Sequence, residues 1–385
     1  QQQRPLRTIL CAPTGRAATH LAHSVEHNLA PWQARADTRF EQRCEVGTIH
    51  RLLGLTPWGR PRHDRTNPLA ADVVVVDEAS MLSAHLMACL LDAIGATTRL
   101  LLVGDPDQLA SVEAGAVLGD IVAAAPAVPV ARLRHTYRFS GAIAELAEAI
   151  RVGDAAGALS IMEARPADIE WVQTDLSDPP LSADALGGLH RAVTAQSRDL
   201  IESALAGDAR GALQALESHR LLIPHRQGPT GVGRWTQIVR GWTAQLVGVG
   251  VDQRRWYPGL PVLITRNDDV QQMYNGDSGV IISRHGGLRL ALSGDDQRLI
   301  VPDMIDSWEP LHASTIHKAQ GSQFDAVTLL LPPTGTALLT RELFYTAVTR
   351  ATSTLRIIGT APQIDHAIRS RALRASGLTS RLGQR

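Results

Sequence analysis

Two adjacent carboxylates, Asp77 and Glu78, directly follow a run of four valines in the stretch Ala71–Ser83. Consecutive β-branched residues are typical of a strand that is buried on both faces in a parallel sheet. In open α/β sheets, ligands bind at the carboxyl ends of the strands. One carboxylate at that edge can hold Mg²⁺ through water, and the other can orient or deprotonate an attacking water. The pattern predicts a Mg-nucleotide site, and a buried strand capped by two solvated acids is the alternative.

A second apolar strand, Arg99–Val103, ends in the polar segment Gly104–Leu109. In that segment Gln108 is neutral and carries both donor and acceptor atoms, which suits a side chain that senses a terminal phosphate or its attacking water. Arg138 lies in a later segment rich in hydrogen-bond donors, where an ordinary surface arginine is the alternative interpretation. Two strands that bring polar residues to one edge indicate a single site built from several βα loops.

The chain begins with a predicted strand at Thr8–Ala12, a turn at Pro13–Gly15 and a helix from about Arg16. Free amides and the helix dipole favour an anion at such a corner, although an ordinary βα turn explains it equally well. The phosphate-binding pattern G-x-x-x-x-G-K-[ST] occurs nowhere in the sequence. Thr48 is a plausible helix N-cap. For the neighbouring His50, a packing or capping role is the alternative to a ligand contact.

Composition places limits on the class of protein. The 385 residues include 38 basic and 38 acidic side chains, so any nucleic-acid surface must be a local groove. Lys318 is the single lysine, and every other basic residue is an arginine. Three cysteines without metal-site spacing fit a reducing compartment. Without an apolar run of membrane-spanning length or a signal-peptide core, we expect a cytoplasmic protein with no membrane partner.

The second half of the chain has a different pattern of predicted helices and strands. Residues 140–215 are mostly helical by period, and a strand at Arg220–Pro224 opens a second α/β unit. From Pro258 onward, short strands and an Asn275-Gly276 turn predict β-hairpins that form a small β-barrel. A helix at Arg341–Arg350 and a final strand complete the unit.

Seven segments resemble, in the correct order, the motif series of superfamily 1 helicases, in particular the RecD branch, the alpha subunit of exodeoxyribonuclease V. They are A-P-T-G-R-A-A from Ala12, G-T-I-H-R-L-L from Gly47, V-V-D-E-A-S-M from Val75, G-D-P-D-Q-L from Gly104, T-Y-R from Thr136, T-I-H-K-A-Q-G-S-Q-F-D from Thr315 and Y-T-A-V-T-R-A from Tyr345. Two further stretches, His225–Val232 and Tyr257–Asp268, favour the exodeoxyribonuclease V subunit over stand-alone RecD-like helicases. Seven ordered motifs are far more specific than any one of them.

The resemblance implies a fold of two RecA-like P-loop NTPase motor domains. It divides the chain into a first, incomplete motor domain at 1–140, a helical connector at 141–215 and a second motor domain at 216–385, with a small SH3-like β-barrel insert at about 270–310. It also implies ATP and Mg²⁺ as cofactors, single-stranded DNA and duplex ends as substrates, and RecB-like and RecC-like subunits as partners. The implied activity is ATP-driven 5′→3′ translocation and unwinding within a recombination-repair nuclease complex.

The resemblance also assigns roles to individual residues. The implied ATP-binding and catalytic residues are Asp77 (holding Mg²⁺ through water), Glu78, Gln108, Arg138, Gly321 and Arg350. Of these, Arg138 and Arg350 would neutralise charge on the transferring phosphoryl group. The implied DNA-binding residues are Pro13, Thr14, Arg16, Thr48, His50, Thr315, His317 and Lys318. Hydroxyls, amides and cations of this kind hold phosphates without reading sequence.

One departure from the family pattern concerns the Walker A loop, whose strand is central in the family's first motor sheet. Because neither that loop nor the N-terminal domain of RecD proteins is present in residues 1–385, we expect a fragment that is inactive by itself. A non-catalytic DNA-binding or assembly subunit and a stand-alone RecD-like helicase remain as rivals. The acids do not cluster outside the nucleotide site, so the sequence contains no candidate nuclease centre.

Overall fold

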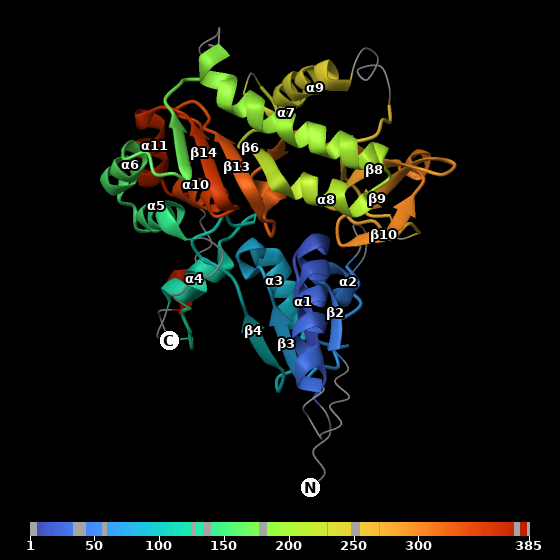
Figure 1. Ribbon diagram of the computed structural model, residues 1–385. Helices are drawn as coiled ribbons and strands as arrows, with labels where there is room; N and C mark the ends of the chain where they lie inside the picture. Colours follow the sequence, from blue (N-terminus) through green and yellow to red (C-terminus); the bar gives the residue numbers. More distant parts are fainter. Residues whose placement is uncertain are drawn as a thin grey trace. The chain divides into compact units, whose positions relative to one another are not determined.

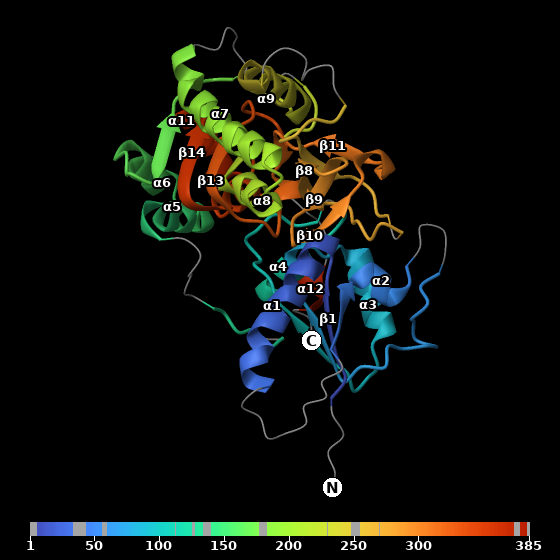
Figure 2. The same ribbon diagram turned by 45° about the vertical axis from the view of Figure 1, so that its right-hand side comes forward.

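The computed structural model describes residues 6–33, 44–55, 60–111, 113–124, 128–133, 140–176, 183–228, 230–247, 255–268, 270–372 and 378–382. The chain divides into two compact units (Figures 1 and 2). Unit 1 comprises Gln1–Leu133 with Leu373–Arg385, and unit 2 comprises Arg134–Ala372. Both contain parallel sheets with helices, which confirms the α/β fold class; the finer domain boundaries expected from the sequence stay a prediction.

Unit 1 is built on a parallel four-stranded sheet of order β2-β1-β3-β4. Its elements are β1 (Thr8–Ala12), α1 (Gly15–Gln33), β2 (Cys44–Thr48), α2 (Ile49–Leu53), β3 (Val73–Val76), the 3₁₀ turn η1 (Ala79–Met81), α3 (Ala84–Ala93), β4 (Arg99–Leu102), α4 (Val117–Ala123) and α12 (Leu378–Leu382). The helix after the acids, α3, begins at Ala84, because Ser83 accepts a hydrogen bond from Leu86 N and caps it.

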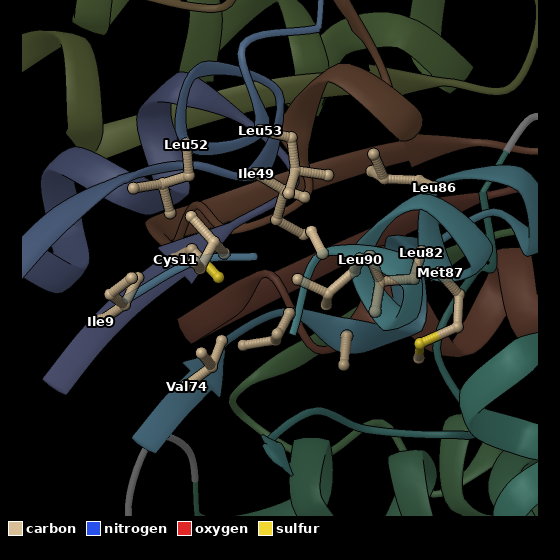
Figure 3. Close-up of a cluster of buried hydrophobic side chains, with 14 of the residues drawn as sticks. Ile9, Cys11, Ile49, Leu52, Leu53, Val74, Leu82, Leu86, Met87 and Leu90 are labelled. Atoms are coloured by element: carbon tan, nitrogen blue, oxygen red, sulfur yellow. The ribbon is translucent and has the colours of Figure 1, made fainter. Parts of the chain in front are cut away.

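One face of the unit 1 sheet carries most of its core. Side chains alternate between the two faces of a strand, so Ile9 and Cys11 of β1 point to one face and Ala12 to the other. Figure 3 shows Ile9 and Cys11 gathered with apolar side chains of α2 and α3 and with Leu82, which follows η1. Ala12 packs instead with Ala17 and Ala18 of α1. The helices α2 and α3 therefore cover one face, and α1 lies against the other.

The expectation of two-sided burial for the valine strand is wrong. Val74 and Val76 of β3 are fully buried in this core, where Figure 3 labels Val74, but Val73 and Val75 are only half-buried. The neighbouring β4 is more open, with an exposed Leu101 side chain on the same face as Val75. A run of valines is compatible with either degree of cover, because periodicity reports only that a residue is apolar.

Unit 2 contains a five-stranded parallel sheet of order β12-β6-β13-β14-β5 and a five-stranded antiparallel sheet of order β10-β9-β8-β7-β11. The parallel sheet and its helices comprise α5 (Gly141–Val152), α6 (Ala155–Glu163), β5 (Ile169–Val172), α7 (Ala183–Leu205), α8 (Ala209–Ser218), β6 (His219–Ile223), α9 (Val232–Val247), β12 (Ser314–Thr315), η4 (His317–Ala319), β13 (Phe324–Leu330), α10 (Arg341–Val348), β14 (Ala351–Ile358) and α11 (Ala361–Arg369). Every residue of β6 is buried, so both faces of this sheet are covered at its centre.

The antiparallel sheet corresponds to the expected β-barrel insert. It comprises β7 (Pro261–Ile264), β8 (Ser278–Arg284), β9 (Gly287–Leu292), β10 (Asp295–Ile300), η3 (Pro302–Met304) and β11 (Trp308–Pro310). The sheet begins earlier than the expected residue of about 270, since β7 pairs with β8 and β11. Within the described residues the two outer strands, β10 and β11, are not paired with each other, so closure into an SH3-like barrel stays a prediction.

Candidate functional site

The carboxyl end of β3 carries the two predicted acids. Backbone pairing continues beyond the strand, because Asp77 N donates to Cys11 O at 2.8 Å. The chain then turns sharply at Glu78, whose φ of 50° and ψ of 39° lie in the left-handed region. Glu78 N donates to the Asp77 carboxylate at 2.9 Å, which fixes the two acids relative to each other. Strained non-glycine backbone of this kind is concentrated at functional sites, so the turn supports a role for this pair.

The ends of β3 and β4 are held together by backbone contacts. Val103 N donates to Val76 O at 2.8 Å, and Ala79 N donates to Val103 O at 2.9 Å. A Cβ at Gly104 would lie 2.9 Å from Ala79 N, so only glycine permits this close approach. The packing brings the segment that contains Gln108 to the same sheet edge as Asp77 and Glu78.

Two buried polar atoms at this edge are unpaired within the described part of unit 1. Gln108 is buried and its amide nitrogen donates to Asp105 Oδ2 at 3.3 Å, but its Oε1 atom has no partner. The hydroxyl of Ser80, two residues after Glu78, is also buried without a partner. Unsatisfied buried groups are uncommon and call for an explanation such as a bound ion or water. The sequence analysis did not predict Ser80 as a site residue, although its hydroxyl, in the turn directly after the two acids, could have indicated it.

The expected DNA-binding residues of unit 1 lie on the other half of the same edge. β1 and β2 are in register at Ala12 and Thr48, so Pro13, Thr14 and Arg16 begin beside the end of β2. Both threonine hydroxyls serve as helix caps: Thr14 Oγ1 accepts from Ala17 N, and Thr48 Oγ1 accepts from Arg51 N, each at 3.2 Å.

The N-cap prediction for Thr48 is confirmed. His50 is exposed on the first turn of α2. A DNA-binding role for this group stays a prediction, because caps and exposed side chains are equally consistent with ordinary structure.

In unit 2, the predicted residues Thr315, His317, Lys318 and Gly321 lie around the end of β12 and the 3₁₀ turn η4. Thr315 pairs in register with Ile223 of β6, and its hydroxyl accepts from Lys318 N at 3.3 Å. Gly321 has a φ of 73°, a conformation that glycine adopts without strain. The hydroxyl of the next residue, Ser322, is buried without a partner in the described residues.

Lys318 is held by an acid that the sequence did not suggest. Its Nζ atom lies 2.9 Å from Glu309 Oε2, and Arg226 contacts the other carboxylate oxygen of Glu309. Burial raises the pKa of Glu309. The hydrogen bond and charge of Lys318, followed by the charge of Arg226, lower it by more than burial raises it, so the pKa of this carboxyl lies below its usual range.

The two predicted arginines have different outcomes. Arg138 lies outside the described residues. Arg350 is 3% exposed, and its guanidinium donates to Thr346 O at 3.1 Å, Ser322 O at 3.0 Å and Thr349 Oγ1 at 3.3 Å. These contacts join the end of α10 to the segment that follows η4. A role for Arg350 at a phosphate stays a prediction.

The predicted site residues are thus grouped separately in the two units. Unit 1 brings Asp77, Glu78 and Gln108 to one sheet edge, and unit 2 groups Thr315, Lys318 and Gly321. No group of three or more His, Cys, Asp or Glu side chains able to hold a metal ion occurs in the described residues. The helices in the described part of the chain also lack the length and apolarity that crossing a bilayer requires.

Two family models match the chain. Residues 2–174 match an AAA domain, and residues 310–358 match a UvrD-like helicase C-terminal domain. The first match covers β3 and β4 with Asp77, Glu78 and Gln108, and the second covers the segment from the last residue of β11 to the end of β14.

Solved structures with a similar arrangement include Pif1 helicases. One, from a study of two coordinating Pif1 helicases at forked double-stranded DNA, has a TM-score of 0.46 at 14% identity, covering 92% of this chain and 82% of that chain. Another is a Bacteroides Pif1 helicase in complex with ADP-AlF3 and single-stranded DNA, with a TM-score of 0.44, 14% identity and coverage of 92% and 89%. At these scores the structural likeness adds nothing to the family assignment, which rests on the sequences.

Curated relatives match almost the whole chain. RecBCD enzyme subunit RecD of Mycolicibacterium smegmatis is 45% identical over 98% of this chain, and the subunit of the same name from Mycobacterium tuberculosis is 44% identical over 98%. The ATP-dependent RecD2 DNA helicase of Deinococcus radiodurans is 31% identical over 97% of this chain and 46% of its own length. The chain spans 66% and 64% of the two RecD subunits. With RecD subunits as relatives along 98% of its length, the chain belongs to the RecD family.

Proposed function

We propose that this chain is the motor part of an ATP-dependent 5′→3′ single-stranded DNA translocase and helicase, acting as the RecD-type subunit of a RecBCD-type recombination-repair exonuclease. The observation that carries the proposal is the identity of 45% to a RecD subunit across 98% of the chain. The AAA-domain match over 2–174 supports nucleotide use, and the site geometry in unit 1 agrees with it.

The acids at the end of β3 fit a Mg-nucleotide. Mg²⁺ prefers oxygen ligands and usually takes one or two carboxylates, several waters and substrate phosphates rather than an all-protein cage. The Asp77 carboxylate and the unpaired Ser80 hydroxyl supply such oxygens, and the absence of a three-residue metal cluster among the described residues is compatible with this mode. Bound Mg²⁺ would neutralise charge on the phosphates.

The remaining chemistry belongs to side chains of this chain. Glu78, held by its amide against Asp77, would orient and deprotonate the attacking water. Gln108 would use its free Oε1 atom to position that water or sense the terminal phosphate. Arg138, Arg350 and the Gly321 loop would complete the phosphate environment. Without a G-x-x-x-x-G-K-[ST] loop, residues 1–385 alone should turn over ATP very slowly.

Single-stranded DNA would lie on hydroxyls, amides and cations at two strand edges. The residues concerned are Pro13, Thr14, Arg16, Thr48 and His50 in unit 1, and Thr315, His317 and Lys318 in unit 2. Groups of this type bind the sugar-phosphate backbone and fix register without reading bases. The proposal also includes RecB-like and RecC-like partners, which the subunit name of the relatives supports, together with duplex DNA ends as substrates and a cytoplasmic setting.

A stand-alone RecD-like helicase is the second candidate, supported by the 31% identity to the Deinococcus RecD2 helicase over 97% of the chain. Copurification decides between the two. A RecD-type subunit should form a stable complex with RecB-like and RecC-like proteins of its own genome, whereas a stand-alone helicase should remain free of them.

ATPase measurements test the proposed site. We expect a version extended at its N-terminus with the Walker A segment of a RecD relative to show ATPase stimulated by single-stranded DNA. In that protein Glu78→Gln should lower kcat by about 10²–10⁴-fold while nucleotide binding persists, as expected for loss of a general base.

Glu45→Gln, which neutralises an exposed acid on β2 of the same unit, is the matched control and should leave kcat unchanged. Turnover that survives Glu78→Gln would exclude Glu78 from the chemistry. ATPase without any response to DNA would contradict the motor assignment.

A further inference from the structure

Two cations of unit 2 come together because their strands are neighbours in register. Thr315 of β12 pairs with Ile223 of β6 in parallel orientation. Arg226 follows Ile223 by three positions, and Lys318 follows Thr315 by the same number. Both side chains therefore arise just beyond the carboxyl ends of adjacent parallel strands, the edge where ligands bind in α/β sheets.

The segments that carry these cations are fixed by local hydrogen bonds. Gly233 N donates to Arg226 O at 3.4 Å and Val232 N donates to His225 O at 3.0 Å, which closes the loop onto the first turn of α9. A Cβ at Gly231 would lie 2.5 Å from the Gln227 carbonyl carbon, so this closure requires glycine. On the other side, the bond from Lys318 N to Thr315 Oγ1 holds η4 against β12.

One acid bridges the two cations. Glu309 lies on β11, the edge strand of the antiparallel sheet, only a few residues before β12. Each of its carboxylate oxygens contacts a different cation, Oε1 Arg226 and Oε2 Lys318. The side chains of Glu309 and Lys318 remain 38% and 30% exposed, and Arg226 is more exposed still. Two positive charges thus converge on one negative group that solvent reaches.

This arrangement differs from an ordinary structural ion pair in the same unit. Arg356 of β14 and Glu170 of β5 are direct register partners on adjacent strands, and both guanidinium contacts go to the single oxygen Glu170 Oε2. That pair links two neighbouring strands, and the remaining nitrogen of Arg356, Nη1, donates to Thr328 Oγ1 on β13 at 3.5 Å. Glu309, by contrast, takes its partners from two loops at a ligand-binding edge and presents its two oxygens to them separately.

We propose that the Glu309 carboxylate occupies the position of a DNA backbone phosphate, and that a phosphate of the bound single strand displaces it from Lys318 and Arg226. The inference rests on the proposed DNA-binding function and deepens it. Carboxylate and phosphate accept the same charge-assisted hydrogen bonds from arginine and lysine, so one group can replace the other. Partly exposed ion pairs are weak, so the exchange costs little. Glu309 is thus a competitor that keeps the cation pair together and lowers its affinity for DNA.

Binding of a fluorescein-labelled oligothymidylate to residues 1–385, measured by anisotropy at several salt concentrations, tests the proposal. Glu309→Gln keeps the shape of the side chain but removes the competing charge, and we expect it to tighten binding about threefold to tenfold at low salt. Lys318→Ala should weaken binding and lower the salt slope by about one ion, since each phosphate neutralised on a single strand releases ~0.7 counterion.

Glu170→Gln is the matched control, because it changes the net charge of unit 2 by the same amount at a different ion pair. It should leave oligothymidylate affinity unchanged. If Glu170→Gln tightens binding as much as Glu309→Gln, overall charge explains the effect and the proposal is overturned.

The single lysine provides a second, direct measurement. Reductive ¹³C-methylation labels Lys318 and the N-terminal amine only, and methylation keeps the charge. In the unaltered chain the Lys318 methyl resonance should shift when oligothymidylate is added, while the N-terminal resonance acts as reference. Glu309→Gln without DNA should also move the Lys318 resonance, because its carboxylate partner is gone.

The possible results distinguish the role proposed for Glu309 from the DNA-binding function on which it rests. Weaker binding by Glu309→Gln, comparable to Lys318→Ala, would show that Glu309 positions Lys318 rather than competes, and would overturn the inference alone. A Lys318 resonance that ignores saturating oligothymidylate would also overturn it. Failure of the unaltered chain to bind oligothymidylate at all would remove both the inference and the DNA-binding role proposed for this chain.

Discussion

The two parallel sheets of this protein differ in how completely they are covered. In unit 2 all five residues of β6 are buried, and β13 is buried over most of its length. In unit 1 the valines of β3 alternate between buried and half-buried, and β4 leaves Leu101 41% exposed. Val103, which follows β4, is 47% exposed. Apolar sequence alone therefore does not determine how much stability a strand contributes, because the elements packed on each face decide how much area leaves water.

The difference also separates the two groups of site residues. The acids and Gln108 lie at the end of a sheet with a single well-packed face, whereas Lys318 and Arg226 lie beside a sheet packed on both. We expect the unit 2 framework to hold its site rigidly and the unit 1 sheet to open more readily. Local opening free energies follow the density of buried apolar contacts.

The largest effect is expected from the core of unit 2. Phe344 on α10 is fully buried, so Phe344→Ala should lower the free energy of unfolding of unit 2 by about 3–5 kcal/mol through lost apolar burial and a residual cavity. Native-state hydrogen exchange of β6 and β13 amides measures this change. Unchanged protection in those strands would contradict the view that unit 2 is one tightly packed body.

Acid should destabilise unit 2 through its buried histidine. Burial, followed by the charges of Arg356 and Arg220, lowers the pKa of His219 to about 3. The unfolded state takes up a proton near pH 6.5 while folded His219 stays neutral, so stability is lost as the pH falls from about 6.5 towards 3, by about 1.4 kcal/mol per pH unit.

His219→Gln should flatten this pH dependence in chemical denaturation of unit 2, whereas His20→Gln, at an exposed site on α1, should not. An unaltered slope in His219→Gln would mean that another group carries the acid sensitivity. His312 is a second candidate, because burial lowers its pKa to about 3 as well.

The smallest effect is expected from substitutions on the two faces of β3. Val74→Ala removes methyl groups from the covered face and should cost about 1–2 kcal/mol of unit 1 stability, whereas Val75→Ala on the more open face should cost less than half as much. Comparing the two variants by denaturant unfolding of unit 1 sharpens the contrast between the sheets. Equal losses would show that the second face is as well packed as the first.

Strand and motif positions could be predicted from the sequence because they depend on local patterns. The strands Thr8–Ala12 and Val73–Val76 and the Thr48 cap agree with the structure, and polar residues after the strands indicated the sheet edge correctly. Burial could not be predicted, since one-sided and two-sided cover select the same apolar residues.

Contacts between distant segments could not be predicted from the sequence either. The pairing of Lys318 with Glu309 depends on a short link between β11 and β12 that brings two different sheets together. The internal bonds of Arg350 depend on how α10 meets the segment after η4. Neither arrangement leaves a periodic signal in the chain.

Directional translocation is the central claim, and streptavidin displacement measures it most directly. With the chain extended by a Walker A segment, the account predicts ATP-dependent displacement of streptavidin from the 3′ end of a biotinylated oligonucleotide, well above displacement from the 5′ end. Loss of this activity in Glu78→Gln would tie it to the acids at the end of β3. Displacement from the 5′ end alone, or from neither end while ATPase is stimulated by DNA, would contradict 5′→3′ movement.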